Sequence, residues 1–168
     1  MSNLLGLEND IPNASVDKDN SELEQAVKNG ANWFYWIAGL SLFNSLLFAF
    51  GTSVSFLTGL GFALVMDVFV GAVVDAGGSP LLRIVSTVTN FVLVAAFALF
   101  GYYAGKQFKG AFLAGIILYL LDIALVLLLE EYLMAGFHAF ALIFIGRGYL
   151  ACRSLDTQRR NAIASTGP

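Results

Sequence analysis

The chain has one cysteine and one histidine among its 168 residues, and charged side chains make up only 12% of it. A lone cysteine, Cys152, cannot form a disulfide within the chain, which excludes a disulfide-stabilised secreted domain. A lone histidine, His138, excludes a haem held by two histidines of the same chain. Nine Lys and Arg against twelve Asp and Glu give a net charge of −3. The sequence therefore lacks the basic character of a nucleic-acid-binding protein, and we predict no nucleic acid among its partners.

Sequence motifs of common enzymes are also missing. The chain has no Gly-x-Ser-x-Gly and no phosphate-binding loop, so it shows neither a serine nucleophile nor a cradle for a nucleotide. We predict no catalytic residue and no cofactor. Apolar side chains are in excess, at 58% of the chain, whereas soluble domains have about 45–50%. This composition excludes a soluble enzyme or a disordered regulator, and it predicts a small multi-pass membrane protein.

Five apolar stretches follow one another from Trp33 onward. Each is about 19–21 residues long, close to the ~20 residues that cross a ~30 Å hydrocarbon core as a helix. They are residues 33–51, 56–75, 84–104, 111–129 and 132–150. Backbone groups in lipid must be satisfied within their own segment, which selects helices. The connections are short, so consecutive helices should be antiparallel neighbours. The sequence predicts an all-α integral membrane bundle over residues 32–151.

The two ends of the chain differ from this membrane body. Residues 1–31 carry six Asp and Glu against two Lys and bury too little apolar surface to fold alone, so we predict a largely disordered acidic tail. Within it, Ser21-x-x-Glu24 fits a capping box, which predicts a short helix over residues 22–28. Residues 152–168 are predicted to form a short basic tail.

Lysine and arginine residues near the segment ends predict the orientation in the membrane. Those after the third and fifth segments lie on one side, which places the C-terminus in the cytoplasm. The side of the N-terminus depends on segment 56–75. If this segment spans, six Lys and Arg lie inside and three outside; if it is re-entrant, eight lie inside and one outside. Charge favours the re-entrant arrangement, whereas segment length favours five spans, and five spans is the prediction.

Four polar residues lie inside the apolar segments: Asp67, Asn90, Asp122 and His138. A helical rise of ~1.5 Å per residue places each of them about 9–12 Å below the non-cytoplasmic face, so they should share one layer. An ionisable side chain costs about 2.5–3.5 kcal/mol at the centre of a membrane helix, so it should face protein and have a partner. The layer is either a hydrogen-bonded knot that fixes helix register or a site that handles protons or ions. Three acids lie at the rim above this layer: Asp75, Glu130 and Glu131.

Residues at the segment ends fit the belt of side chains that anchors membrane proteins at the lipid–water interface. The predicted anchors are Trp33, Trp36, Tyr102, Tyr103, Arg147 and Tyr149. Within the first segment, Ser41, Asn44 and Ser45 share one helical face. We expect them to hydrogen-bond to a neighbouring helix.

Several runs together resemble a group of small multi-pass bacterial membrane proteins. These runs are residues 33–41 (WFYWIAGLS), 59–61 (GLG), 119–122 (YLLD) and 136–138 (GFH), and the likeness covers about residues 32–155. Proteins of that group have no assigned activity. The resemblance implies a location in the bacterial inner membrane and implies no chemistry.

Three functions are compatible with this pattern. The first is a non-enzymatic structural or accessory subunit, a scaffold that associates through its helix faces; its partners would be the lipid bilayer and a second copy or a larger membrane complex. The second is a small proton- or ion-coupled transporter that uses the Asp/His layer. The third is a metal-dependent intramembrane enzyme, but one histidine without motif spacing is a weak signal, so we predict no metal ligand. Five helices leave little room for a substrate path, which favours the subunit.

Overall fold

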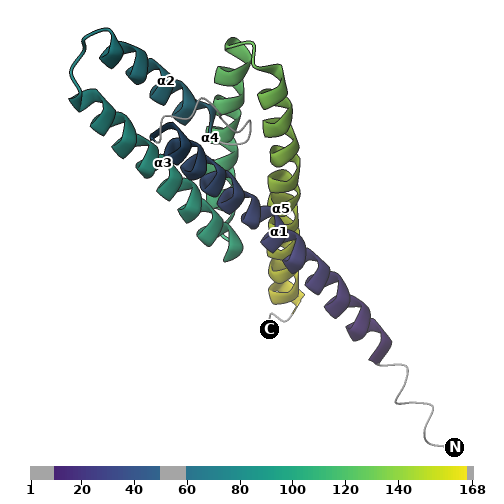
Figure 1. Ribbon diagram of the computed structural model, residues 1–168. Coiled ribbons are helices and arrows are strands. Elements are labelled where there is room, and N and C mark those ends of the chain that lie inside the picture. Colours follow the sequence, from purple (N-terminus) through teal and green to yellow (C-terminus); the bar gives the residue numbers. More distant parts are fainter. Residues whose placement is uncertain (1–9, 50–59, 166–168) are drawn as a thin grey trace, which may run out of the picture.

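The computed structural model describes residues 10–49 and 60–165, and this part of the chain is helical apart from short turns. The helices are α1 (Asp10–Ala49), α2 (Gly61–Asp75), α3 (Leu81–Gly105), α4 (Lys109–Leu128) and α5 (Tyr132–Ser165). They pack side by side in one bundle (Figure 1). Three of them, α3, α4 and α5, are long and apolar enough to cross a membrane. The predicted all-helical bundle is confirmed; residues 50, 51 and 56–59 of the first two predicted segments lie outside the described residues.

Helix α1 is longer than the apolar segment that the sequence predicts. It begins at Asp10 and has 40 residues, about 60 Å at the usual rise. The structure therefore differs from the prediction of a disordered tail, of which residues 1–9 lie outside the described residues. Ser21 lies within the helix, where its hydroxyl donates to the Lys18 carbonyl, so it caps no helix start. Val27 and Ala31 are buried, and this tertiary contact supplies the apolar burial that the isolated segment lacks.

Helix α5 also extends beyond its predicted end, and it packs against the middle of α1. The two helices meet at Gly30 and Gly148, where a Cβ added to Gly30 would lie only 2.6 Å from the Gly148 Cα. Residues 152–165, predicted as a tail, continue the helix, and Cys152 and Leu155 are buried. Contact between α1 and α5 thus accompanies burial of residues just outside both ends of the predicted membrane body.

Helix α2 differs most from the prediction. It has 15 residues, about 22 Å at the usual rise, which is short of the ~30 Å of a hydrocarbon core. It also runs parallel to the end of α1, because Ser41 contacts Leu60 and Ser45 contacts Asp67. The expectation that the first two segments are antiparallel neighbours is therefore wrong. Helix α2 lies beside the last turns of α1 and runs in the same direction.

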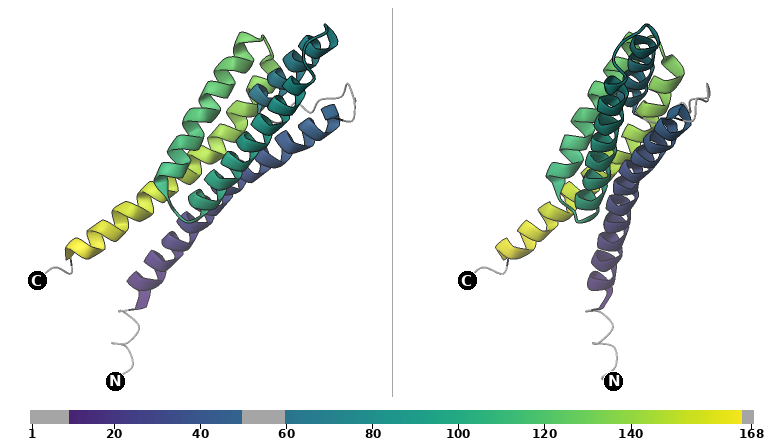
Figure 2. Two further views of the ribbon diagram at one scale, coloured as in Figure 1. Left: turned by 90° about the vertical axis from the view of Figure 1, so that its left-hand side faces the viewer. Right: turned by 60° about the vertical axis from the view of Figure 1, so that its left-hand side comes forward.

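The direction of the helices brings both ends of the described chain to one end of the bundle. Helices α3, α4 and α5 alternate in direction after α2, and the start of α1 lies at the same end as the last turn of α5 (Figures 1 and 2). The α2–α3 and α4–α5 turns lie at the opposite end. Five antiparallel spans would have placed the two termini at opposite ends.

The core between α1, α3 and α4 is mainly aromatic. Phe34, Phe97 and Phe112 are buried, and the Phe34 ring lies 6.2 Å from Phe97 and 6.0 Å from Phe112 between ring centroids. Tyr119 extends this cluster along α4 toward the α4–α5 turn, and its ring centroid lies 6.1 Å from that of Phe97. The aromatic core therefore ends directly against the buried histidine described below.

Candidate functional site

The first buried polar group joins α4 to α5. The Asp122 carboxylate and the His138 Nε2 atom are 2.8 Å apart, and the His138 Nδ1 atom lies 2.8 Å from the Met134 carbonyl. Both side chains are buried, with 0% of the His138 side chain and 5% of the Asp122 side chain exposed. The Tyr119 ring stacks on the imidazole at 4.8 Å between centroids.

These contacts restrict where the hydrogens of the Asp122–His138 pair lie. A carbonyl oxygen only accepts, so the Nδ1 atom of His138 carries a hydrogen and donates it to Met134. The Nε2 atom then either donates to an ionised Asp122 or accepts from a protonated Asp122. In both forms Asp122 and His138 share one proton and are neutral as a pair, which lowers the cost of burying them.

Asp122 also holds the start of α2. Its two carboxylate oxygens accept hydrogen bonds from the backbone N–H groups of Gly61 and Phe62, each at 2.8 Å. The first N–H groups of a helix have no partner within the helix, and the positive end of the helix dipole favours an anion there. A Cβ on Gly61 would overlap the Val126 side chain, so glycine permits this close approach. Asp122 therefore caps a helix that begins inside the bundle.

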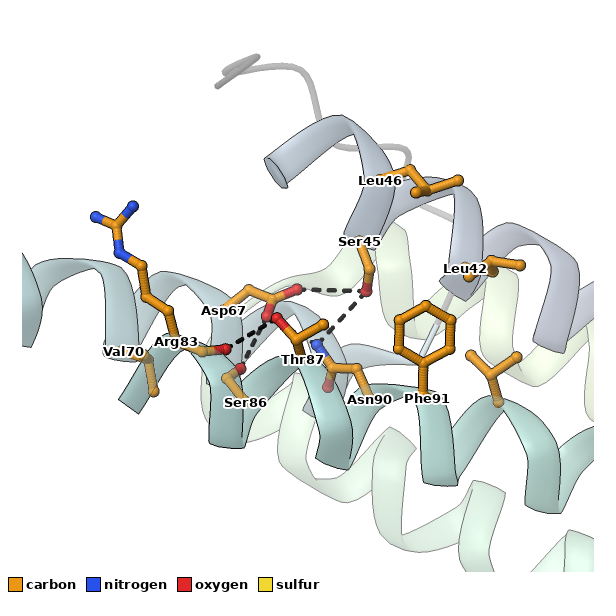
Figure 3. A pocket seen from close by; sticks show the side chains of 11 residues that line it. Leu42, Ser45, Leu46, Asp67, Val70, Arg83, Ser86, Thr87, Asn90 and Phe91 are labelled. Atoms are coloured by element: carbon orange, nitrogen blue, oxygen red, sulfur yellow. Dashed lines mark hydrogen bonds between the residues drawn. The ribbon is translucent and has the colours of Figure 1, made fainter. Parts of the chain in front are cut away.

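The second buried polar group joins α1, α2 and α3 around Asp67 (Figure 3). The Asp67 carboxylate accepts hydrogen bonds from the Ser86 hydroxyl at 2.9 Å and the Asn90 amide at 2.8 Å, and from the Ser45 hydroxyl at 3.4 Å. Asp67 is 8% exposed. Within the described residues its carboxylate has no ion-pair partner, so every donor it has is neutral.

A partly open cavity of about 280 Å³ lies beside this cluster. Six of its lining residues are polar: Ser45, Asp67, Arg83, Ser86, Thr87 and Asn90. The Arg83 guanidinium points away from Asp67 and pairs with the exposed Asp75 at 2.8 Å (Figure 3). The charges near the cavity are thus one buried carboxylate and one neutralised ion pair at its edge.

Asn90 leaves one polar atom unused. Its amide nitrogen donates to Asp67, but its buried Oδ1 atom has no hydrogen-bond partner among the described residues. An unpartnered buried acceptor is uncommon in proteins and costs about 1–3 kcal/mol. The Asp67 cluster is therefore incompletely satisfied, in contrast to the Asp122–His138 pair.

The four residues of the predicted layer form these two clusters and not one. Asp122 pairs with His138, and Asp67 pairs with Asn90. Helix α2 links them, since Asp122 binds its first residue and Asp67 lies six residues further on, about 9 Å along the axis. A layer estimated from depth alone does not show this, because residues at similar depth on different helix faces need not meet.

Two serines, Ser45 and Ser86, complete the Asp67 cluster. Of Ser41, Asn44 and Ser45, which we expected to bond to a neighbouring helix, Ser45 donates to Asp67 of α2, and Ser41 accepts from the N–H of Leu60, the residue before α2, at 2.7 Å. For Asn44 the expectation stays a prediction. Ser86 is a contact that the sequence did not predict. Its spacing of four residues from Asn90, which puts both on one face of α3, is the signal that could have identified it.

The remaining predicted residues lie at the ends or on the surface of the bundle. Glu130 and Glu131 are exposed in the α4–α5 turn, where Glu130 has a φ of 60°. Trp33 packs within the bundle, stacked on Phe144 of α5 at 5.0 Å. The other predicted anchors are exposed or half-buried: Trp36, Tyr102, Tyr103, Arg147 and Tyr149.

No protein-family model, curated protein or solved structure matches this chain. The resemblance to small bacterial membrane proteins therefore stays a prediction. The structure defines the class only broadly, as an all-helical bundle with three helices that could cross a membrane. No three His, Cys, Asp or Glu side chains of the described residues are grouped so that they could hold a metal ion.

Proposed function

We propose that this chain is a small ion-coupled membrane carrier whose solute site is the cavity beside Asp67. The observation that carries the proposal is the Asp67 carboxylate, which lines a cavity and receives hydrogen bonds only from neutral groups of the described residues. A buried ionisable residue in a membrane bundle is a functional site by default, and this one has a space beside it that a solute can enter.

The position at which α2 begins supports the same proposal. Helix α2 begins inside the bundle, with its first N–H groups bound to Asp122 and not to a helix that continues below it. Carriers commonly form their solute sites beside helices that begin or end at membrane depth; here the backbone N–H groups at the start of α2 are held by Asp122, and Asp67 lies six residues further on. The Asp67 cavity lies along this short helix.

Coupling follows from the chemistry of one carboxylate. Asp67 can bind and release a proton beside the cavity, so proton transfer at this site links to the movement of a solute. The other ionisable groups near it are Arg83 and Asp75, which neutralise each other, and the Asp122–His138 pair at the start of α2. None of these forms an ion pair with Asp67.

In this proposal the α1–α2 unit crosses the bilayer once, and α3, α4 and α5 complete four passes. Both termini then lie in the cytoplasm with eight of the nine Lys and Arg residues, and only Arg83 lies outside. This distribution satisfies the positive-inside rule better than five spans. A cysteine in place of Ser21 should react with a membrane-impermeant maleimide only in inverted vesicles, and one in place of Glu131 only in intact cells. Labelling of both from one side would contradict this topology.

Transport is tested in proteoliposomes that contain a pH-sensitive dye. Solutes of three charge classes, cationic, neutral and anionic, are added outside, and the change in luminal pH is followed. We expect at least one class to give a protein-dependent change that Asp67→Asn abolishes. Glu131→Gln, which removes an exposed carboxylate at the same end of the bundle, should leave it unchanged. A signal that persists in Asp67→Asn, or no signal with any class, would contradict the carrier.

A second function, the non-enzymatic structural subunit, is favoured by the Asp122–His138 pair. Asp122 and His138 use their hydrogen-bonding groups on partners within the chain. Such a saturated pair holds helices together and leaves little capacity for a ligand. If the protein co-purifies with a membrane partner and shows no flux, the subunit is the better description.

A further inference from the structure

We infer that the Asp67 cavity binds a small organic cation: an ammonium group with a compact apolar body. This inference names the solute class of the carrier proposed above and takes its site from that proposal. It depends on three properties of the cavity, namely its charge, its volume and the character of its walls.

The charge of the site is negative. Asp67 is nine-tenths buried and has no cationic partner among the described residues, while Arg83 is held by Asp75 with its guanidinium directed away from the carboxylate. Ser45, Ser86 and Asn90 donate to Asp67 but carry no charge. A ligand that supplies one positive charge would therefore neutralise the site, whereas an anion would meet a buried carboxylate.

The hydrogen-bonding character of the site fits the same ligand. An ammonium group has up to three N–H donors and no acceptor. The Asp67 carboxylate is an acceptor that lines the cavity, whereas the Oδ1 atom of Asn90 is buried with almost no accessible surface and is not open to a ligand there. The site thus offers a charged oxygen, which suits a donor-only head group.

The volume and walls exclude a bare ion as the sole occupant. One water needs only about 10–15 Å³ of such space, and the cavity of about 280 Å³ approaches the ~300 Å³ at which small-molecule sites begin. Its remaining walls are apolar: Leu42, Leu46, Val70, Phe91 and Val94. An apolar body would fill this part of the cavity, and the Phe91 ring can also face a cation.

Three probes with one benzyl or phenyl ring and different charge test the inference: benzylammonium, benzyl alcohol and benzoate. Binding to the full-length protein in lipid nanodiscs is measured by calorimetry, with empty nanodiscs subtracted. We expect benzylammonium to bind at one site per chain and the other two at least tenfold more weakly. Equal binding of the three probes, or tighter binding of benzoate, would overturn the inference.

Two variants locate the binding site. Asp67→Asn keeps the shape of the side chain and should weaken benzylammonium binding at least tenfold, because the charge is lost. Since Asp67 also joins three helices, the second variant leaves it intact: Val94→Phe should reduce binding by filling the apolar end of the cavity. Glu131→Gln is the control and should bind as the unmodified chain does. Unchanged binding in both cavity variants would overturn the inference.

The flux assay separates this inference from the carrier. If benzylammonium binds with these properties but no solute crosses the proteoliposome membrane, the cation site stands and the carrier fails. If a neutral or anionic solute is transported and benzylammonium does not bind, the carrier stands and the cation site fails.

Discussion

Replacing Asp122 by asparagine tests the carboxylate that joins α2 and α5 to α4. The change keeps the size of the side chain, but it replaces one of the two accepting oxygens by an NH₂ group, which cannot accept a hydrogen bond. One of the two backbone N–H groups of α2 then loses its acceptor, and His138 loses the carboxylate with which it shares a proton. Two lost hydrogen bonds within a membrane protein, at ~0.6 kcal/mol each, set a lower bound of about 1 kcal/mol. A broken buried ion pair sets an upper bound of about 3–5 kcal/mol.

The free energy of unfolding in mixed micelles, titrated with SDS, measures this loss. Asp75→Asn is the matched control: it also removes a carboxylate from a pair, but the pair is exposed, so its loss should cost only about 0.2–1 kcal/mol. His138→Phe should destabilise the protein similarly to Asp122→Asn, and the double variant should cost less than the two single changes together. A loss below ~0.5 kcal/mol for Asp122→Asn, or strict additivity, would refute the assigned role of this pair.

Three further predictions concern packing, a turn and the cysteine. Gly148→Ala places a methyl group 2.8 Å from the Gly30 Cα and should destabilise the bundle by about 1–3 kcal/mol relative to Gly146→Ala, since Gly146 has open space around it; equal SDS-unfolding free energies would contradict the close approach of α1 and α5. Glu130→Gly should stabilise the protein by up to about 1–2 kcal/mol in the same titration, because Glu130 adopts a left-handed conformation with a φ of 60°. Cys152, 2% exposed and bonded to the Gln107 carbonyl, should react with maleimide much more slowly in the native protein than in SDS; native labelling as fast as that of an added cysteine at the exposed Ser154 would contradict its burial.

Much of the fold was predictable because the lengths of the apolar segments and their continuity leave helices as the only stable choice in lipid. Both ends of α3 and α4 and the start of α5 lie within three residues of the predicted segments, near the turns where Gly77, Pro80 and Gly105 interrupt the pattern. The extent of α1 and α5 was not predictable, since residues 10–31 and 152–165 are polar, and the burial of Val27, Ala31, Cys152 and Leu155 depends on tertiary contacts.

The candidate site was predictable in its members more than in its arrangement. Hydropathy identifies Asp67, Asn90, Asp122 and His138, because a polar group inside an apolar run is conspicuous. It does not identify their partners, since a partner depends on which helix face turns toward which neighbour. The parallel course of α1 and α2 brings Ser45 to Asp67, and a sequence read as antiparallel spans places Ser45 elsewhere.

By itself, the sequence determined that the chain is a bundle of apolar helices with a few buried ionisable side chains, because composition and segment length decide how a chain is compatible with lipid. Only the tertiary structure decided that α2 stops short of a full span, that Asp122 caps it, and that Asp67 stands beside a cavity. These features depend on contacts between residues 19 to 61 positions apart, and the periodicity of one segment carries no information about them.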